Sequence, residues 1–422
     1  MIVQAVEAGL TIPGRPPIAG RPNLPEPAAS QVKVTIIEDL RDLYDLRPAW
    51  DTLHAAMGGT NPFTQWAWMW RWWGLYGRTH GSTRDRLHVI VIWSGGTAWA
   101  IVPLVLTTRG YGRLAVRKLR MYGAVPRTNL TEVPAVLVWP GWEAAAADAL
   151  VATLRDCQAE YAWCDLDNLP MDDALGRWFA ARAEAEGWIW RAPVSGHVLT
   201  LPATWEALRA GLKRNIKESL RRCYNSLARD GHQWRFEAVT QLDQLPGALN
   251  QFFELHTARA AMQQGPSHPD HFARSWLHRA FLQLVGADLA PEGRFMVCRL
   301  WVNDAVVAST VVLPTGDNMY MYYSGFDPAW GRYSVMTTLT AECIKLAIAS
   351  GARTVDFSPG TAVSKTRWGT RERAYGQLRI VAPTVAARAL NRGQQWVSSG
   401  SPALSGLRDD LARKLALRAE PG

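Results

Sequence analysis

The sequence has no apolar run long enough to cross a bilayer, because its longest apolar stretches are the length of single strands. Its five cysteines include no C-x-x-C pair, which predicts reduced, mostly buried thiols rather than disulfides or a thiolate zinc site. His268 and His271 have no neighbouring cysteine or convincing carboxylate partner, so we expect no bound metal. A Walker loop and a Ser-His-Asp pattern are also missing, which argues against P-loop and triad chemistry.

The first ten residues lack the basic stretch that opens a signal peptide, and prolines follow them. We therefore expect a cytoplasmic protein, with a peripheral position at the inner membrane as a variant of this prediction. Positive charge is abundant: 46 Lys and Arg against 37 Asp and Glu give a net charge of +9 and a pI near 9.5. This balance favours anionic partners such as nucleotides, CoA, tRNA or a lipid surface.

The most informative stretch is Asn318–Gly369. It opens with an aromatic strand over Met319–Ser324, passes a tight turn, and continues as a long amphipathic helix over Tyr333–Ser350. A second strand over Arg353–Ser358 and a polar, basic loop follow. This order predicts a βαβ unit whose functional end lies at the strand tips.

The start of the helix in this unit is a candidate anion site. A helix N-terminus has unpaired backbone N–H groups and the positive end of the helix dipole. Gly331 and Ser334 lead into this helix, and the geometry would suit a pyrophosphate. The structural alternative is that the helix end binds nothing, as in most βαβ units.

Several short motifs resemble a known family. They are GFDPAW at 325–330, Tyr333-Ser334, DFSPG at 356–360, the run Lys365-x-Arg367-Trp368-Gly369, LHTARA at 255–260 and the basic segment 213–231. In this order they resemble the second half of BioF2-like or CelD-like proteins of the GNAT N-acetyltransferase superfamily, which are related to the Fem peptidyltransferases. The resemblance covers roughly residues 35 to 382.

The resemblance implies an α/β fold with tandem GNAT-like (acyl-CoA N-acyltransferase) domains, whose mixed central sheets are flanked by helices. We expect a Pro/Gly-rich leader over 1–30, an N-terminal domain over 31–195 and a C-terminal domain with the site over 196–382. A linker and a short basic amphipathic helix should complete the chain over 383–422. The tryptophan-rich segment 63–77 is expected to form a helix in the core.

The resemblance also implies an acyltransferase that uses an acyl-CoA such as acetyl-CoA and no metal. The acceptor would be an amine or hydroxyl of a small molecule or glycan in cell-envelope or exopolysaccharide metabolism. One departure is that Val335-Met336 stand where relatives often have Pro-Gly, and glycine lets a backbone approach a pyrophosphate closely. Two alternatives fit this departure: a Fem-like transferase that uses aminoacyl-tRNA, and a non-catalytic scaffold of a polysaccharide-synthesis complex, which could sit peripherally at a membrane.

Acyl transfer needs a group that takes the acceptor's proton. Asp356, at the tip of a strand, is predicted to be this base or a substrate anchor, and its structural alternative is a carboxylate that bonds a turn. Tyr333 and His256 are the other predicted catalytic residues.

Acyl transfer also needs cations for the donor's phosphates. Ser334, Gly331, Lys365 and Arg367 are expected to bind the donor, whereas a solvated loop is the alternative for the two cations. Arg259 lies one helical turn after His256 and shares its face, which by the resemblance looks toward the acceptor, whereas a solvated surface pair is the alternative. Tyr322 is expected to contact the acceptor as well, with core packing as its alternative.

Overall fold

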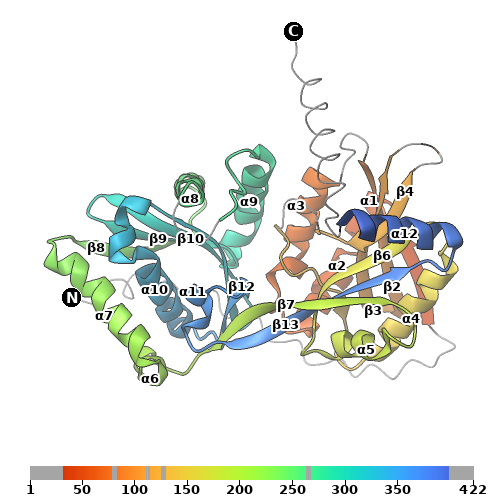
Figure 1. Cartoon of the computed structure of the whole chain (residues 1–422), viewed down its shortest axis with the longest axis horizontal. Coiled ribbons are helices and arrows are strands. Elements are labelled where there is room, and N and C mark those ends of the chain that lie inside the picture. The colour runs from red at the N-terminus through yellow and green to blue at the C-terminus, as the bar shows by residue number, and fades with distance from the viewer. Residues whose placement is uncertain are drawn as a thin grey trace, which may run out of the picture.

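The computed structural model describes residues 32–77, 83–110, 112, 115–124, 130–262 and 268–398. Two lobes lie side by side and are linked by two long strands (Figure 1). The first lobe contains β1 Val32–Ile37, α1 Leu40–Asp45, α2 Arg47–Ala56, α3 Trp66–Tyr76, β2 Thr83–Ser94, β3 Thr97–Arg109, β4 Val116–Met121, β5 Leu137–Val138, α4 Glu143–Asp156, β6 Trp163–Pro170, α5 Ala174–Arg182 and β7 Ile189–Thr200.

The second lobe contains α6 Trp205–Gly211, α7 Arg214–Arg229, β8 Trp234–Val239, α8 Leu245–Ala260, α9 Trp276–Leu289, β9 Met296–Val302, β10 Ala305–Thr315, β11 Asn318–Phe326, α10 Val335–Ala349, β12 Thr354–Pro359 and α11 Val363–Thr366. The chain then returns to the first lobe through β13 Arg371–Val381, and α12 Val385–Ser398 lies on that lobe (Figure 1). Short 3₁₀ turns precede α3, β9 and α10. Within the described residues, no helix is both long and apolar enough to span a membrane.

The strands of both lobes belong to one mixed sheet, in the order β1-β2-β3-β4-β6-β13-β7-β12-β11-β10-β9-β8, with β5 paired to β3. Each lobe contains a parallel pair with a helix in between: β4 and β6 around α4, and β11 and β12 around α10. The predicted tandem GNAT-like fold is therefore confirmed. The two sheets are nevertheless continuous, because β13 lies between β6 and β7.

The tryptophan-rich helix α3 is buried as expected, and it also joins the lobes. Trp68 is fully buried, and its ring lies edge-on to Phe281 of α9 with 4.9 Å between centroids. Arg71 on the same helix forms a two-pronged ion pair with Asp288 of α9, at 2.6 and 2.8 Å. The contacts between α3 and α9 hold the two lobes together next to β11, whose Tyr322 also contacts Trp68.

The segment after β13 differs from the expected linker, because residues 385–398 form α12. Thr384 accepts a hydrogen bond from the Ala387 N–H, and Asn391 of the helix accepts one from the buried Arg379. Arg379 in turn bonds both oxygens of Asp165 in β6, at 2.6 and 2.9 Å. These contacts explain why the chain is helical here. The predicted leader 1–30 and the predicted basic helix at 403–418 lie outside the described residues.

Candidate functional site

A cleft opens where β11 and β12 separate. The two strands pair in parallel only as far as Tyr320 and Asp356. Beyond that point β11 stays with β10, whereas Pro359 of β12 pairs with Gly196 of β7. The cleft measures about 500 Å³ and is lined by Glu132, Arg259, His268, Pro269, His271, Thr310, Met321, Tyr322, Tyr323, Ser324, Phe326, Met336, Thr337, Thr340, Phe357, Ser358, Pro359, Gly360, Thr361, Ala362, Ser364, Lys365, Arg367 and Trp368.

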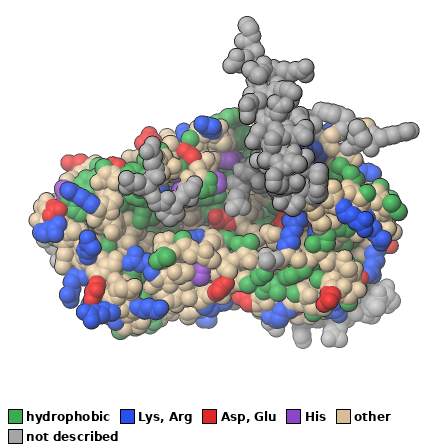
Figure 2. All heavy atoms as spheres, in the orientation of Figure 1, with side chains coloured by type: hydrophobic (Ala, Val, Ile, Leu, Met, Phe, Trp, Pro, Cys, Tyr) green, Lys and Arg blue, Asp and Glu red, His purple; other side chains and the backbone are tan. Residues whose placement is uncertain are grey.

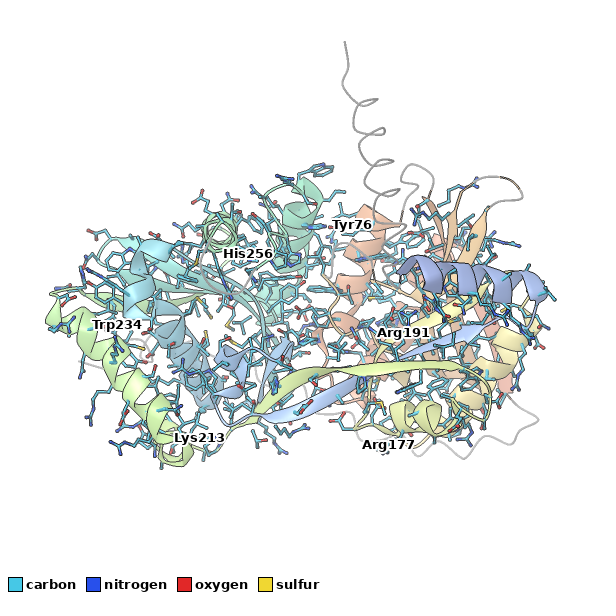
Figure 3. All side chains as sticks on the ribbon, viewed as in Figure 1. Tyr76, Arg177, Arg191, Lys213, Trp234 and His256 are labelled. Atoms are coloured by element: carbon cyan, nitrogen blue, oxygen red, sulfur yellow. The ribbon has the colours of Figure 1, made fainter. Side chains whose placement is uncertain are left out.

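Helix α8 lies directly against β11 because of Gly325. A Cβ at this position would meet the His256 backbone nitrogen at 2.3 Å, so only glycine allows this approach. The contact places two polar residues of α8 beside Ser324: His256 donates from Nδ1 to its carbonyl at 3.1 Å, and Arg259 donates to its Oγ at 2.9 Å. Arg259 lines the cleft, whereas His256 is 0% exposed and is not among the lining residues. Figure 3 labels His256 close to α8.

The segment with the two predicted phosphate-binding cations is an ordered turn of helix, α11, rather than a solvated loop. Trp368 is buried and donates to the Ser364 carbonyl at 3.1 Å, which fixes the turn to the core. Lys365 Nζ donates to Ser358 Oγ at 2.8 Å and to the Pro359 carbonyl at 2.7 Å. Its charge is therefore held at the cleft wall, where burial lowers its pKa.

The cleft is rich in positive charge that no protein carboxylate balances directly. Arg259, Lys365 and Arg367 all line it, and none of the three forms an ion pair with a described residue. Burial also lowers the pKa of the Arg259 guanidinium. A half-buried cation without an ion-pair partner is costly, and an anionic ligand would reduce that cost.

One carboxylate on the cleft wall comes from the first lobe. Glu132 lies in the segment before β5, and its Oε2 accepts a hydrogen bond from the Tyr320 hydroxyl of β11 at 2.6 Å. The segment is fixed because Asn168 donates to the Glu132 carbonyl at 2.6 Å and Tyr322 donates to the Leu130 carbonyl. Burial raises the pKa of Glu132 to about 7, although the Tyr320 hydrogen bond and the Lys365 charge lower it. Such a carboxyl can exchange a proton near neutral pH.

Asp356 lies beneath the cleft rather than on its wall. It is 4% exposed, and its Oδ1 accepts from the Ser358 N–H at 2.9 Å. Ser358 has a positive φ of 63°, which is rare for a residue with a side chain, and this hydrogen bond holds the turn that leads to Gly360. Burial raises the pKa of Asp356 to about 6, although the Ser358 hydrogen bond and the charges of Arg373 and Lys365 lower it.

The N-terminus of α10 reaches the cleft through its first turn. Met336 and Thr337 belong to the lining, whereas Gly331 and Ser334 are exposed just before the helix. Ser334 has a left-handed backbone with φ of 54°, and its side chain makes no capping hydrogen bond. The amide end of the helix therefore remains available to an anion at one end of the cleft.

Tyr333 points away from the cleft. Its hydroxyl donates to Asp230 Oδ2 at 3.0 Å and accepts from Arg332 at 2.6 Å, and it lies 3.1 Å from His232 Nε2. The ring is 3% exposed and packs in the core of the second lobe. This network connects the end of α7 to the start of α10.

Replacing Tyr333 by Phe tests its predicted catalytic role. The ring would still fill its place, but the hydroxyl's bonds to Asp230 and Arg332 would be lost, so we expect unfolding free energy to fall by about 1 kcal/mol. We expect turnover to stay within about twofold, since the hydroxyl does not reach the cleft. Urea unfolding and steady-state assays on one preparation check both values, and a large loss of turnover at unchanged stability would restore the catalytic role.

Tyr322 lines the cleft with its ring, but its hydroxyl is bonded to the Leu130 carbonyl and faces the first lobe. Burial raises its pKa well above the ordinary value, so the hydroxyl stays protonated. The structure thus brings together Arg259, Tyr322, Lys365 and Arg367, and it separates them from His256 and Tyr333. The sequence analysis did not identify Glu132, because no local pattern distinguishes it. It lies against β11 through contacts between the two lobes.

Comparison with known proteins agrees with this architecture. Residues 214–366 match the model of the acetyltransferase (GNAT) domain family. No curated protein matches the chain. The crystal structure of FemX aligns with 83% of this chain and 97% of its own, with a TM-score of 0.54 and 10% sequence identity.

Two further solved structures are similar to this chain, both at lower TM-scores. A conserved protein of unknown function from Bacteroides thetaiotaomicron aligns over 82% of this chain and 99% of its own, with a TM-score of 0.47 and 13% identity. A tandem GNAT protein from the clavulanic acid biosynthesis pathway aligns over 84% and 99%, with a TM-score of 0.44 and 13% identity. The second lobe thus contains the match to the GNAT domain family, and over 83% of the chain the fold is similar to that of FemX.

Proposed function

We propose that the cleft transfers an acyl group from an anionic donor to an amine or hydroxyl acceptor. The observation that supports this most is the composition of its wall: three cations without ion-pair partners, and one carboxylate whose pKa lies near 7. The cations suit the phosphates of an acyl-CoA such as acetyl-CoA, and the carboxylate suits a general base. The GNAT domain match supports the same reaction class.

In this proposal the donor's phosphates contact Lys365, Arg367 and the first turn of α10, with Gly331 and Ser334 at the approach. The acceptor enters past Arg259, and its nucleophilic atom attacks the thioester carbonyl carbon. Glu132 takes the proton from the attacking nitrogen or oxygen, and the C–S bond then breaks to release the thiol. The step needs no metal and no redox partner.

The acceptor is proposed on the resemblance to BioF2-like and CelD-like proteins alone. It would be a small molecule or glycan of cell-envelope or exopolysaccharide metabolism, handled by a cytoplasmic enzyme that can sit peripherally at the inner membrane or in a polysaccharide-synthesis complex. A cleft of about 500 Å³ has room for a sugar-sized or amino-acid-sized acceptor next to the thioester.

A second donor, aminoacyl-tRNA, is favoured by the outer face of α7. Lys213, Arg214, Lys217, Arg221 and Arg222 are exposed there, and Figure 2 shows Lys and Arg side chains gathered over α6 and α7. A basic helix beside a GNAT domain offers the contacts that a phosphate backbone requires. The lack of aromatic residues on this face argues against base recognition, so the acyl-CoA remains the main proposal.

Thermal unfolding with added ligands tests the proposal. A ligand that binds only the folded protein raises the melting temperature, and the rise grows with the logarithm of its concentration relative to its Kd. We expect a rise with acetyl-CoA and CoA, and a smaller rise in Lys365→Ala and Arg367→Ala. The matched control is Arg222→Ala, whose side chain is exposed on α7. Equal rises in all four proteins would contradict the phosphate site, and a rise with aminoacyl-tRNA alone would favour the second donor.

A further inference from the structure

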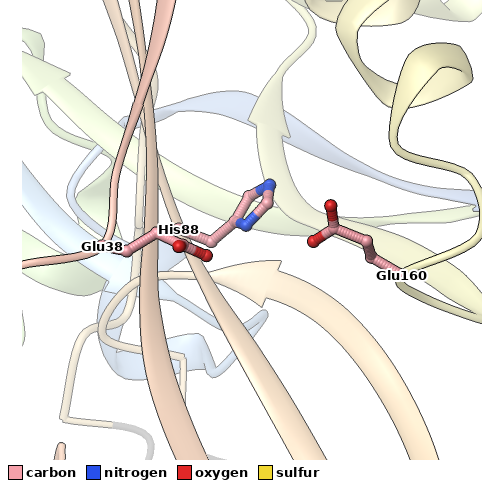
Figure 4. A group of neighbouring side chains, drawn as sticks. All are labelled: Glu38, His88 and Glu160. Carbon is pink, nitrogen blue, oxygen red and sulfur yellow. The ribbon is translucent and has the colours of Figure 1, made fainter.

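The first lobe contains a group of three side chains that the proposed transferase does not use. Glu38 follows β1, His88 lies in β2, and Glu160 lies in the turn between α4 and β6. One ligand atom from each lies within 4.8 Å of the others. Figure 4 shows the imidazole of His88 between the two carboxylates. Within the described residues, this is the one group of three or more such side chains with this spacing.

His88 is the residue that needs an explanation. Its side chain is 1% exposed, and neither ring nitrogen has a hydrogen-bond partner. Buried polar atoms are almost always satisfied, since an unsatisfied one costs about 1–3 kcal/mol. The neighbouring Leu87 and Val89 are also buried, so the strand around His88 belongs to the core of the lobe.

The chemistry of the group identifies what would satisfy it. An ionised carboxylate can only accept hydrogen bonds, and a neutral imidazole without a hydrogen-bond partner keeps a free lone pair on one ring nitrogen. Two carboxylate oxygens and one imidazole lone pair are therefore three acceptors that face one another. A cation is the ligand that pairs with all three at once.

We propose that Glu38, His88 and Glu160 bind a divalent transition-metal ion, for which Zn²⁺ is the best match. One nitrogen and two oxygen ligands suit Zn²⁺, whereas Mg²⁺ prefers oxygen ligands and retains its waters. Glu38 also forms a largely exposed ion pair with Arg86 at 3.1 Å, which leaves its second oxygen for the metal. Three protein ligands leave a fourth position for water.

The position of the group indicates a stabilising role. β1 is the edge strand and pairs only with β2, and its last pair is Ile37 with Val89. Glu38 is the next residue, so a metal at this point would fasten the end of β1 to His88 and to the α4–β6 turn. Metal binding would then appear as added thermal stability of the folded chain.

Calorimetric titration of ZnCl₂ into the tag-free, EDTA-treated full-length protein tests the site. We expect the wild type to bind one Zn²⁺ per chain. In both Glu38→Gln and Glu160→Gln the ion should be lost or bound about tenfold or more weakly, because removing a direct ligand should cost at least as much as removing an outer contact. The matched control is Glu184→Gln, whose exposed side chain makes no described contact. His88→Ala is avoided, since the cavity could unfold the lobe.

Melting temperatures provide the second measurement. Zn²⁺ should raise the melting temperature of the wild type and of Glu184→Gln, and MgCl₂ at the same concentration should not. A wild-type chain that binds no Zn²⁺, or a Glu160→Gln chain that binds the same number of ions with the same affinity, would overturn the site.

Discussion

Replacing Glu132 by Gln should reduce turnover on the order of a hundredfold or more. Gln keeps the shape of the side chain and can still accept from the Tyr320 hydroxyl, but it cannot take a proton. In the wild type the base acts when ionised, so kcat/KM should rise with pH through about 7, which is the pKa of Glu132. This rising limb should be lost in the variant.

As pH rises through about 7, the wild type should gain activity and lose stability. The pKa of Glu132 is higher in the folded protein than its ordinary value, so its contribution to stability is complete below that ordinary value and is lost as pH rises through about 7. Gln does not ionise, so the melting temperature of Glu132→Gln minus that of the wild type should increase between about pH 5 and 8. A structural residue would lose both activity and stability.

Comparing Asp356→Asn with Glu132→Gln tests which of the two carboxyl groups is the base. The sequence predicts Asp356 as the base, but its carboxylate bonds the Ser358 N–H beneath the cleft. Asn can still accept that bond, so we expect Asp356→Asn to keep much more activity than Glu132→Gln. A loss confined to Asp356→Asn, with an active Glu132→Gln, would return the role to Asp356.

Replacing Arg259 by Ala should weaken binding of one anionic substrate by about tenfold to a hundredfold. A charged hydrogen bond is worth about 1.5–3 kcal/mol, and the Arg259 guanidinium lines the cleft without a carboxylate partner. The change should appear in KM more than in kcat, since the guanidinium is expected to bind substrate rather than move a proton. The melting temperature should hold or rise, because a half-buried charge is removed.

The design of this experiment identifies which substrate carries the anion. A higher KM for the donor alone assigns Arg259 to the donor's phosphates, and a higher KM for the acceptor alone assigns it to an acidic group of the acceptor. Arg259→Lys keeps the charge but loses the planar fork, so it should fall between Ala and the wild type. Unchanged KM values in Arg259→Ala would exclude Arg259 from binding, and Arg222→Ala again serves as the exposed control.

Local patterns in the sequence were enough to predict the βαβ unit. The expected helix over Tyr333–Ser350 corresponds to α10 at Val335–Ala349, and the expected strands correspond to β11 and β12. Apolar periodicity and glycine positions are local features, so they define such elements well. The aromatic face of the segment 63–77 likewise predicted a buried helix, although not its contact with α9.

What the sequence did not predict depends on residues far apart in the chain. Glu132 reaches the cleft only because Tyr320 and Tyr322 of the other lobe bond its segment. The group of Glu38, His88 and Glu160 likewise comes from three separate elements, so no ligand spacing could mark it. Lys365 was predicted to bind the donor from a polar, basic loop, with a solvated loop as the alternative. The helical turn there could not be predicted, because the burial of Trp368 and the bonds to Ser358 are tertiary contacts.

The place of β13 between β6 and β7 has a consequence for the way the chain folds during synthesis. β6 pairs with β4 on one side, but its other side and much of β7 have no neighbouring strand until residues 371–381 leave the ribosome. Until then these strands present open edges, which are sites for mispairing with other chains. A chain that ends before residue 371 therefore lacks the strand that joins the two halves of the sheet, and one edge of β6 and one edge of β7 stay open.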